Sequence, residues 1–151
     1  MAESNAIDAL LKKLEYSFSD LSLLDEALTH RSYASNNNER LEFLGDGILN
    51  FVIAHELFKP YPAVQAGDLS RLRSNLVNKD SLAVIAGHLG LGDVIKLGSG
   101  ELKSGGFRRP SILADAVESI FGAVYCDGGF DACRALIIRL YADRLASSMD
   151  L

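Results

Sequence analysis

Five acidic residues at helical spacing, set within two apolar stretches, constrain the fold of this chain most. Glu39, Glu42 and Asp46 in the first stretch are spaced at i, i+3 and i+7. At about 100° of rotation per residue, their carboxylates fall within one narrow stripe of a helix. The apolar residues that flank this stripe, and that we expect on or beside its packing face, are Leu41, Leu44, Ile48 and Phe51.

The second stretch, residues 112–118, places Asp115 and Glu118 on one helical face at i and i+3. Acids on half-buried helices repel one another and lose hydration, which is unfavourable unless a cation or a basic partner compensates. Residues 112–118 contain no Lys or Arg, and only Arg40 interrupts the first stretch. A hard divalent cation with oxygen ligands would suit such a site. The spacing leaves two interpretations open, a solvated acidic face or a metal site.

The amino-acid sequence of these stretches resembles that of the endonuclease domain of the ribonuclease III family. Residues 39–46 read ERLEFLGD, which is similar to the family signature. The other matching blocks, in family order, are ALTHRS at 27–32, GDLSRLR at 67–73, GELKSGG at 100–106 and ILADAVE at 112–118. Together the likeness runs from about residue 9 to residue 145. An eight-residue signature, together with four further blocks in the family order, strongly favours the nuclease interpretation.

The resemblance implies an all-α, ribonuclease III endonuclease-like helical bundle over residues 1–151, acting as a homodimer. It implies an endoribonuclease that cleaves double-stranded RNA with Mg²⁺, or with Mn²⁺ as a substitute, in the processing of rRNA and mRNA. Metal-activated water would attack the phosphorus and leave 5′-phosphate and 3′-hydroxyl ends. Bacterial members usually carry a second, double-stranded-RNA-binding domain afterwards, and we expect the present chain to lack it.

The resemblance also assigns roles to individual residues. The expected metal ligands are Glu42, Asp46, Asp115 and Glu118, and the expected catalytic residues are Asp46, Glu118 and Glu39. Phe43 would pack into a cavity of the partner subunit, the alternative being an ordinary core residue.

Two positions depart from the family pattern. Gly47 stands where relatives usually have Ser or Ala, and a glycine inside a helix costs roughly 0.5–1 kcal/mol, so a slightly looser site is expected. Ala66 stands where a Glu is frequent, which leaves the surroundings of a second metal open.

Hydrophobic periodicity predicts helices along the whole chain and no strands. The expected helices are 7–14, 21–30, 39–58, 67–77, 79–89, 110–125 and 131–147, with a Gly-rich stretch at 90–106. The polar residues 35–38 suit an N-terminal cap, and Pro60 and Pro62 end the helix that follows it. Pro110 suits the first turn of the next acidic helix.

Length and composition indicate one domain outside the membrane. A chain of 151 residues is long enough to bury a core. No apolar run approaches the ~18 residues of a membrane span, and the N-terminus lacks a signal sequence. We therefore expect a cytoplasmic protein. Cys126 and Cys133 lack a CxxC pattern and are expected to be reduced, mostly buried thiols.

The net charge of −5 is unusual for a nucleic-acid-binding protein, because phosphate contacts supply most non-specific affinity. Five of the 20 acidic residues, however, belong to the expected metal site. The basic residues cluster in two groups, the first being Arg71, Arg73 and Lys79, and the second Lys103, Arg108 and Arg109. The first group fits a solvated surface as well as an RNA role. The second lies in a Gly-rich loop before an acidic helix and is the better candidate for RNA contact.

Other interpretations are weaker. Residues 98–104 lack the Gly before Lys of a phosphate-binding loop and follow no predicted strand. A di-iron bundle requires Glu-x-x-His repeats, and no histidine here has a Glu three residues earlier. For His30 a structural role after a helix is the default expectation. A catalytically silent relative, serving as a dimeric RNA-binding or scaffold module, remains the alternative function, although silent relatives lose acidic ligands and this chain keeps all five.

Overall fold

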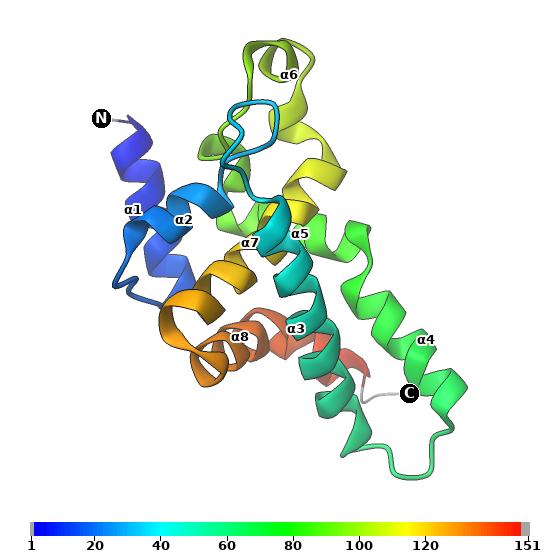
Figure 1. The fold of residues 1–151 in the computed structure, drawn as a ribbon. Coiled ribbons are helices and arrows are strands. Elements are labelled where there is room, and N and C mark those ends of the chain that lie inside the picture. Colours follow the sequence, from blue (N-terminus) through cyan, green and yellow to red (C-terminus); the bar gives the residue numbers. More distant parts are fainter. Residues whose placement is uncertain (1, 149–151) are drawn as a thin grey trace.

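The computed structural model describes residues 2–148 and is built from helices packed around one central helix (Figure 1). Its α-helices are α1 (Ala2–Leu14), α2 (Leu21–Ala27), α3 (Glu39–Phe58), α4 (Ala66–Val77), α5 (Lys79–Leu89), α6 (Ser99–Lys103), α7 (Pro110–Gly128) and α8 (Phe130–Ser148). Two short 3₁₀ helices follow, η1 (Leu91–Asp93) within the Gly-rich stretch and η2 (Gly106–Arg108) at its end. Within the described residues the sole β contact is a parallel bridge between Thr29 and Lys96. The expected all-α class is confirmed. No helix in this part of the chain is long and apolar enough to cross a membrane.

Helix α7 forms the centre of the core. Every residue from 116 to 124 is buried, and a helix that is apolar on all sides must be surrounded by other elements. Helices α2, α3, α5 and α8 all pack against it, as Figure 1 shows. Pro110 occupies its first turn as expected, and Gly129, with a φ of 91°, ends it. Residues in the middle of α7 are therefore held by contacts from several directions.

Two glycines bring α3 and α7 into backbone contact. A Cβ atom on Gly45 would lie 1.7 Å from the carbonyl oxygen of Glu118. A Cβ on Gly122 would lie 2.2 Å from the carbonyl oxygen of Leu41. Real Cβ atoms do not approach so closely, so each helix offers a glycine to the backbone of the other. This reciprocal contact sets the acidic stripes of α3 and α7 beside each other.

The start of α1, the end of α2 and the cap of α3 differ from the sequence prediction. Helix α1 begins at Ala2 instead of residue 7. Helix α2 ends at Ala27 instead of residue 30, because the backbone after it pairs with residue 96. The Lys96 N–H donates to the Leu28 carbonyl at 2.8 Å, and the His30 N–H donates to the Lys96 carbonyl at 3.0 Å. The cap of α3 also differs in detail. The side chain of Asn37 accepts from the Glu39 N–H at 3.1 Å, while that of Asn38 donates to the Ala27 carbonyl.

Two burial predictions are wrong. Cys133 is buried, but Cys126 is exposed on the last turn of α7. Phe51 was expected on or beside the packing face of α3, yet 57% of its surface is exposed. The buried face of α3 is centred near Ile48 and Val52, and Phe51 lies about 100° from Val52 around the helix. Its ring instead packs against that of Phe130, with 5.9 Å between the ring centroids.

Candidate metal centre

Three carboxylates from α3 and α7 converge at the N-terminal half of both helices. One oxygen from each of Glu42, Asp115 and Glu118 lies within 4.8 Å of the other two. Oxygens that bind one Mg²⁺ or Ca²⁺ at 2.0–2.6 Å lie no more than about 5 Å apart. Glu118 is buried, whereas Glu42 and Asp115 are partly buried. The three residues therefore have the donor type and spacing of a site for a hard cation, and we call them the acidic cluster.

Asp46 adjoins the acidic cluster through Glu118. The side chains of Asp46 and Glu118 are hydrogen-bonded to each other. One turn further along α3, the Asn50 amide donates to the Asp46 carbonyl at 2.9 Å and to its carboxylate at 3.3 Å. Among the described residues, Asp46 is not one of the three whose oxygens meet. The structure thus places this expected ligand beside Glu118, where it orients the buried carboxyl group.

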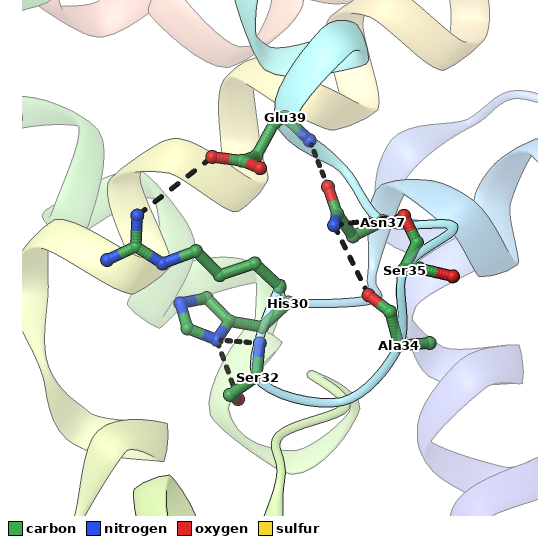
Figure 2. Close-up of polar contacts among 7 residues, drawn as sticks. His30, Ser32, Ala34, Ser35, Asn37 and Glu39 are labelled. Carbon is green, nitrogen blue, oxygen red and sulfur yellow. Dashed lines mark hydrogen bonds and ion pairs between the residues drawn. The ribbon is translucent and has the colours of Figure 1, made fainter.

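Glu39 lies at the rim of the site. Its side chain is exposed and forms an ion pair with Arg31, whose Nη1 is 3.9 Å from its Oε2 (Figure 2). It is one helical turn before Glu42, on the same stripe of α3. Its charge acts on Glu42, but its carboxylate does not join the three that meet. A contact with substrate or with a second cation suits this position better than a ligand role in the acidic cluster.

Burial, followed by the neighbouring acids, raises two pKa values in the cluster. Burial, followed by the hydrogen bond and charge of Asp46, raises the pKa of Glu118 to about 9. Burial, followed by the charge of and hydrogen bond with Asp115, raises the pKa of Glu42 to about 7. Without a metal, the cluster therefore holds protons near neutral pH. A divalent cation would release these protons, because its charge favours the carboxylate form.

This proton uptake predicts how stability depends on pH. The unfolded chain releases the Glu118 proton near pH 4.5 and the folded chain near pH 9, so the folded state binds more protons between those values. The free energy of unfolding of the metal-free protein should therefore fall as pH rises across this window. Glu118→Gln should remove most of that fall and be more stable than wild type by about 1–3 kcal/mol near pH 8.5, with little difference near pH 5. Urea unfolding with a chelator at both pH values measures this, and equal pH slopes for the two proteins would contradict it.

A lysine from a third helix contributes the nearest positive charge. The Lys79 ammonium, at the start of α5, lies 2.5 Å from the Asp115 carboxylate. The hydrogen bond with Asp115 is the main cause that raises the pKa of Lys79. From sequence this residue fitted either a solvated surface or an RNA role. Nothing in the spacing of the chain indicates that it reaches Asp115, 36 residues away.

A cleft of about 310 Å³ opens beside the acidic cluster. Glu39, Glu42 and Asp115 form one side, and basic side chains also line it. These basic residues are His30, Arg31 and Arg109. A cleft with carboxylates for a cation and cationic hydrogen-bond donors in reach of them suits a phosphodiester, which needs its negative oxygens neutralised.

The three residues expected to contact RNA differ in their relation to this cleft. Arg109 lines it and is held by Glu101, with 2.9 Å between guanidinium and carboxylate. Arg108 lies over the Phe107 ring at 5.1 Å from its centroid. Lys103 is exposed at the end of α6. Only Arg109 is thus directly part of the cleft.

His30 is a cleft residue that sequence reasoning missed. Its Nδ1 accepts a hydrogen bond from the Ser32 N–H at 3.1 Å and lies 2.7 Å from the Ser32 hydroxyl (Figure 2). Burial is the main cause that lowers its pKa, so the ring is neutral at neutral pH and carries its proton on Nε2. That proton can serve as a donor in the cleft. The sequence feature that could have identified His30 as a site residue is its position in the ALTHRS block at 27–32.

Phe43 is not a core residue. On α3 its side chain is 84% exposed, which excludes the ordinary-core alternative. It borders an apolar groove of about 350 Å³ that also includes Ile48, Phe51 and Phe130. We call this groove and the rings around it the apolar face.

Comparisons with known proteins agree with this geometry. Residues 20–145 match a family model described as Ribonuclease-III-like. A protein named Ribonuclease 3 from Alkalilimnicola ehrlichii is 62% identical over 140 residues, covering 93% of this chain and 61% of that protein. The Ribonuclease 3 of Bordetella petrii is 57% identical over 142 residues, covering 94% of this chain and 56% of that protein. The chain thus spans less than two thirds of the length of these relatives.

Solved structures of ribonuclease III nuclease domains are also similar to this chain. The nuclease domain of ribonuclease III from Campylobacter jejuni superposes with a TM-score of 0.87 at 45% identity, covering 91% of this chain and 95% of that one. A second structure of that domain, described for flexibility in a region involved in dimer formation, has a TM-score of 0.89 at 46% identity, covering 91% of this chain and 96% of that one. Dicer from Pichia stipitis is more distant, with a TM-score of 0.65 at 26% identity over 87% of this chain and 58% of that one.

Proposed function

The chain belongs to the ribonuclease III family, and on that premise we propose that it is an endoribonuclease domain that cleaves double-stranded RNA with a divalent cation. The observation that carries the proposal is the acidic cluster, three carboxylate oxygens within 4.8 Å of one another, at the edge of a cleft that also holds basic side chains. Mg²⁺ is the expected ion and Mn²⁺ its substitute, because the donors are hard carboxylate oxygens.

Each side chain then has a defined task. Glu42, Asp115 and Glu118 would hold the cation, and Asp46, which lies beside Glu118, would add a further negative charge to the site. When bound, the cation supplies hydroxide from a coordinated water at neutral pH and neutralises charge on the scissile phosphate. Displacement of the 3′ oxygen at phosphorus leaves 5′-phosphate and 3′-hydroxyl ends.

The basic side chains of the cleft receive the substrate. Arg109 and His30 line the cleft, and the guanidinium of Arg109 and the Nε2–H of His30 would donate to non-bridging phosphate oxygens. Lys103 and Arg108, outside the cleft, suit the adjoining backbone phosphates. Duplex RNA is recognised through its shape, 2′-hydroxyls and phosphates, so a structured precursor of rRNA or mRNA is the expected kind of substrate.

One assay tests this function. Labelled duplex RNA is incubated with the protein in Mg²⁺, in Mn²⁺ and in excess chelator, beside a single strand of the same sequence. We expect cleavage of the duplex only when a divalent cation is present. A folded protein that binds the duplex but leaves it intact in both metals would support the silent RNA-binding or scaffold alternative.

We further propose that the domain acts as a homodimer through its apolar face. Phe43, Phe51 and Phe130 expose apolar surface on neighbouring parts of α3 and α8, and a contiguous apolar patch of this kind is typical of an interface. In a two-fold dimer each contact is made twice.

Phe43→Ala is therefore expected to weaken the dimer disproportionately. Loss of a large ring from both sides should raise the dimer dissociation constant by roughly a hundredfold. Sedimentation equilibrium of wild type and variant measures it. Leu21→Ala is a suitable control, since Leu21 is 57% exposed on α2 and does not line the apolar groove. An unchanged dimer for Phe43→Ala, or a monomeric wild type, would refute the interface role.

A further inference from the structure

Lys79 is tied to the acidic cluster by position as well as by charge. Its Nζ lies 2.5 Å from Asp115 Oδ1, and its charge interacts with Glu42 and Glu118 as well. The residue follows the tight corner between α4 and α5, where Asn78 ends one helix and caps the next by accepting from the Ser81 N–H at 2.8 Å. The stem of Lys79 therefore begins at a fixed point beside the site.

A lysine at position 79 does not stabilise the helix to which it belongs, α5. A cation in the first turn of a helix is disfavoured by the helix dipole, which prefers an acid there, and Asp80 already supplies one. The side chain is also 58% exposed, so burial of its stem contributes little to the core. The contact that this position provides is the ion pair with Asp115.

We propose that Lys79 is a tethered counterion of the metal centre, which holds the carboxylates together before a cation binds and then lowers the affinity for that cation. The inference rests on the proposed function, because it assumes that the acidic cluster binds a divalent cation. A bound cation and the ammonium would share Asp115 and repel each other. Lys79 must therefore move toward solvent, or remain at a cost to cation binding.

Physical magnitudes favour a measurable effect. Two like charges a few ångströms apart near a protein surface interact strongly even at an effective dielectric constant of about 20. Because the lysine stem is flexible and largely exposed, withdrawal of the ammonium relieves most of this repulsion. A gain in cation affinity of roughly tenfold is expected when the competing charge is removed.

The test is calorimetric titration of the whole chain with Mn²⁺ near pH 8, without RNA. Lys79→Met and Lys79→Gln should each lower the Mn²⁺ dissociation constant by roughly tenfold, and Lys79→Arg should remain close to wild type. Lys59→Met is the matched control, since it removes the same charge from an exposed site. Lys59 follows Asp46 by 13 residues (59 − 46), which is about 20 Å along the helix and beyond the screening length of about 8 Å.

A second measurement separates this role from a purely structural one. In chelator, urea unfolding of Lys79→Met should reveal a less stable protein than wild type, and saturating Mn²⁺ should stabilise the variant by more than it stabilises wild type. If wild type binds Mn²⁺ and both neutral variants bind it equally or more weakly, the counterion role is overturned. If wild type binds no Mn²⁺ at all, the metal centre of the proposed function fails and the inference falls with it.

Discussion

Replacement of Glu118 by Gln is expected to reduce cleavage of duplex RNA at least about a thousandfold at ordinary Mg²⁺ concentrations. The amide keeps the size of the carboxyl group and can retain a hydrogen bond with Asp46, but it cannot supply negative charge to a cation. Glu118 is the most buried member of the acidic cluster, only 6% exposed, so water is a poor substitute for it. Asp46→Asn should also lose most activity, because the amide removes the negative charge that Asp46 places beside Glu118.

The rate of cleavage is measured under single-turnover conditions, with duplex binding followed separately. Glu118→Gln should still bind duplex RNA and should bind Mn²⁺ far more weakly than wild type. Glu56→Gln provides a control on α3, the helix that carries Glu42, since the Glu56 carboxylate pairs with Arg134 at 3.2 Å and is not part of the cluster. Cleavage at the wild-type rate by Glu118→Gln would remove the metal-centre assignment.

The second large effect concerns Gly45. Its replacement by Ala should destabilise the fold by about 3–5 kcal/mol, because the new Cβ would lie 1.7 Å from the backbone carbonyl of Glu118. A backbone carbonyl cannot turn aside as a flexible side chain can, so α3 and α7 must separate. Since a domain of this size is stable by only about 5–15 kcal/mol, a large share of its stability would be lost.

Gly47 provides the matched comparison, two residues along the same helix. A Cβ at Gly47 would meet no atom within 4 Å, so Gly47→Ala should stabilise the protein by about 0.5–1 kcal/mol through helix propensity. Urea unfolding of both variants measures the difference. Equal stability changes would show that α3 and α7 do not depend on close approach at Gly45.

Local spacing was enough to predict most of the helices. Helix α3 has the predicted bounds, and α5 does as well, because apolar periodicity and flanking Pro, Asn and Gly residues act within one or two turns. The Gly-rich stretch was less informative. It contains η1 and α6 and ends where η2 begins, and the backbone of Lys96 within it pairs with residues 28 and 30. Such a contact between distant segments leaves no periodic signal.

Some features of the candidate site could likewise be predicted from the sequence, and others depended on the tertiary structure. The sequence by itself determined which acids share a helical stripe, because rotation per residue is a local property, and its ordered blocks indicated the family. Only the tertiary structure decided that Glu42 meets Asp115 and Glu118, since that meeting depends on Gly45 and Gly122 letting two backbones touch. It also decided that Lys79 is the nearest counter-charge. These contacts join residues far apart in the chain, and their distances follow from how the helices pack around α7, which no local pattern specifies.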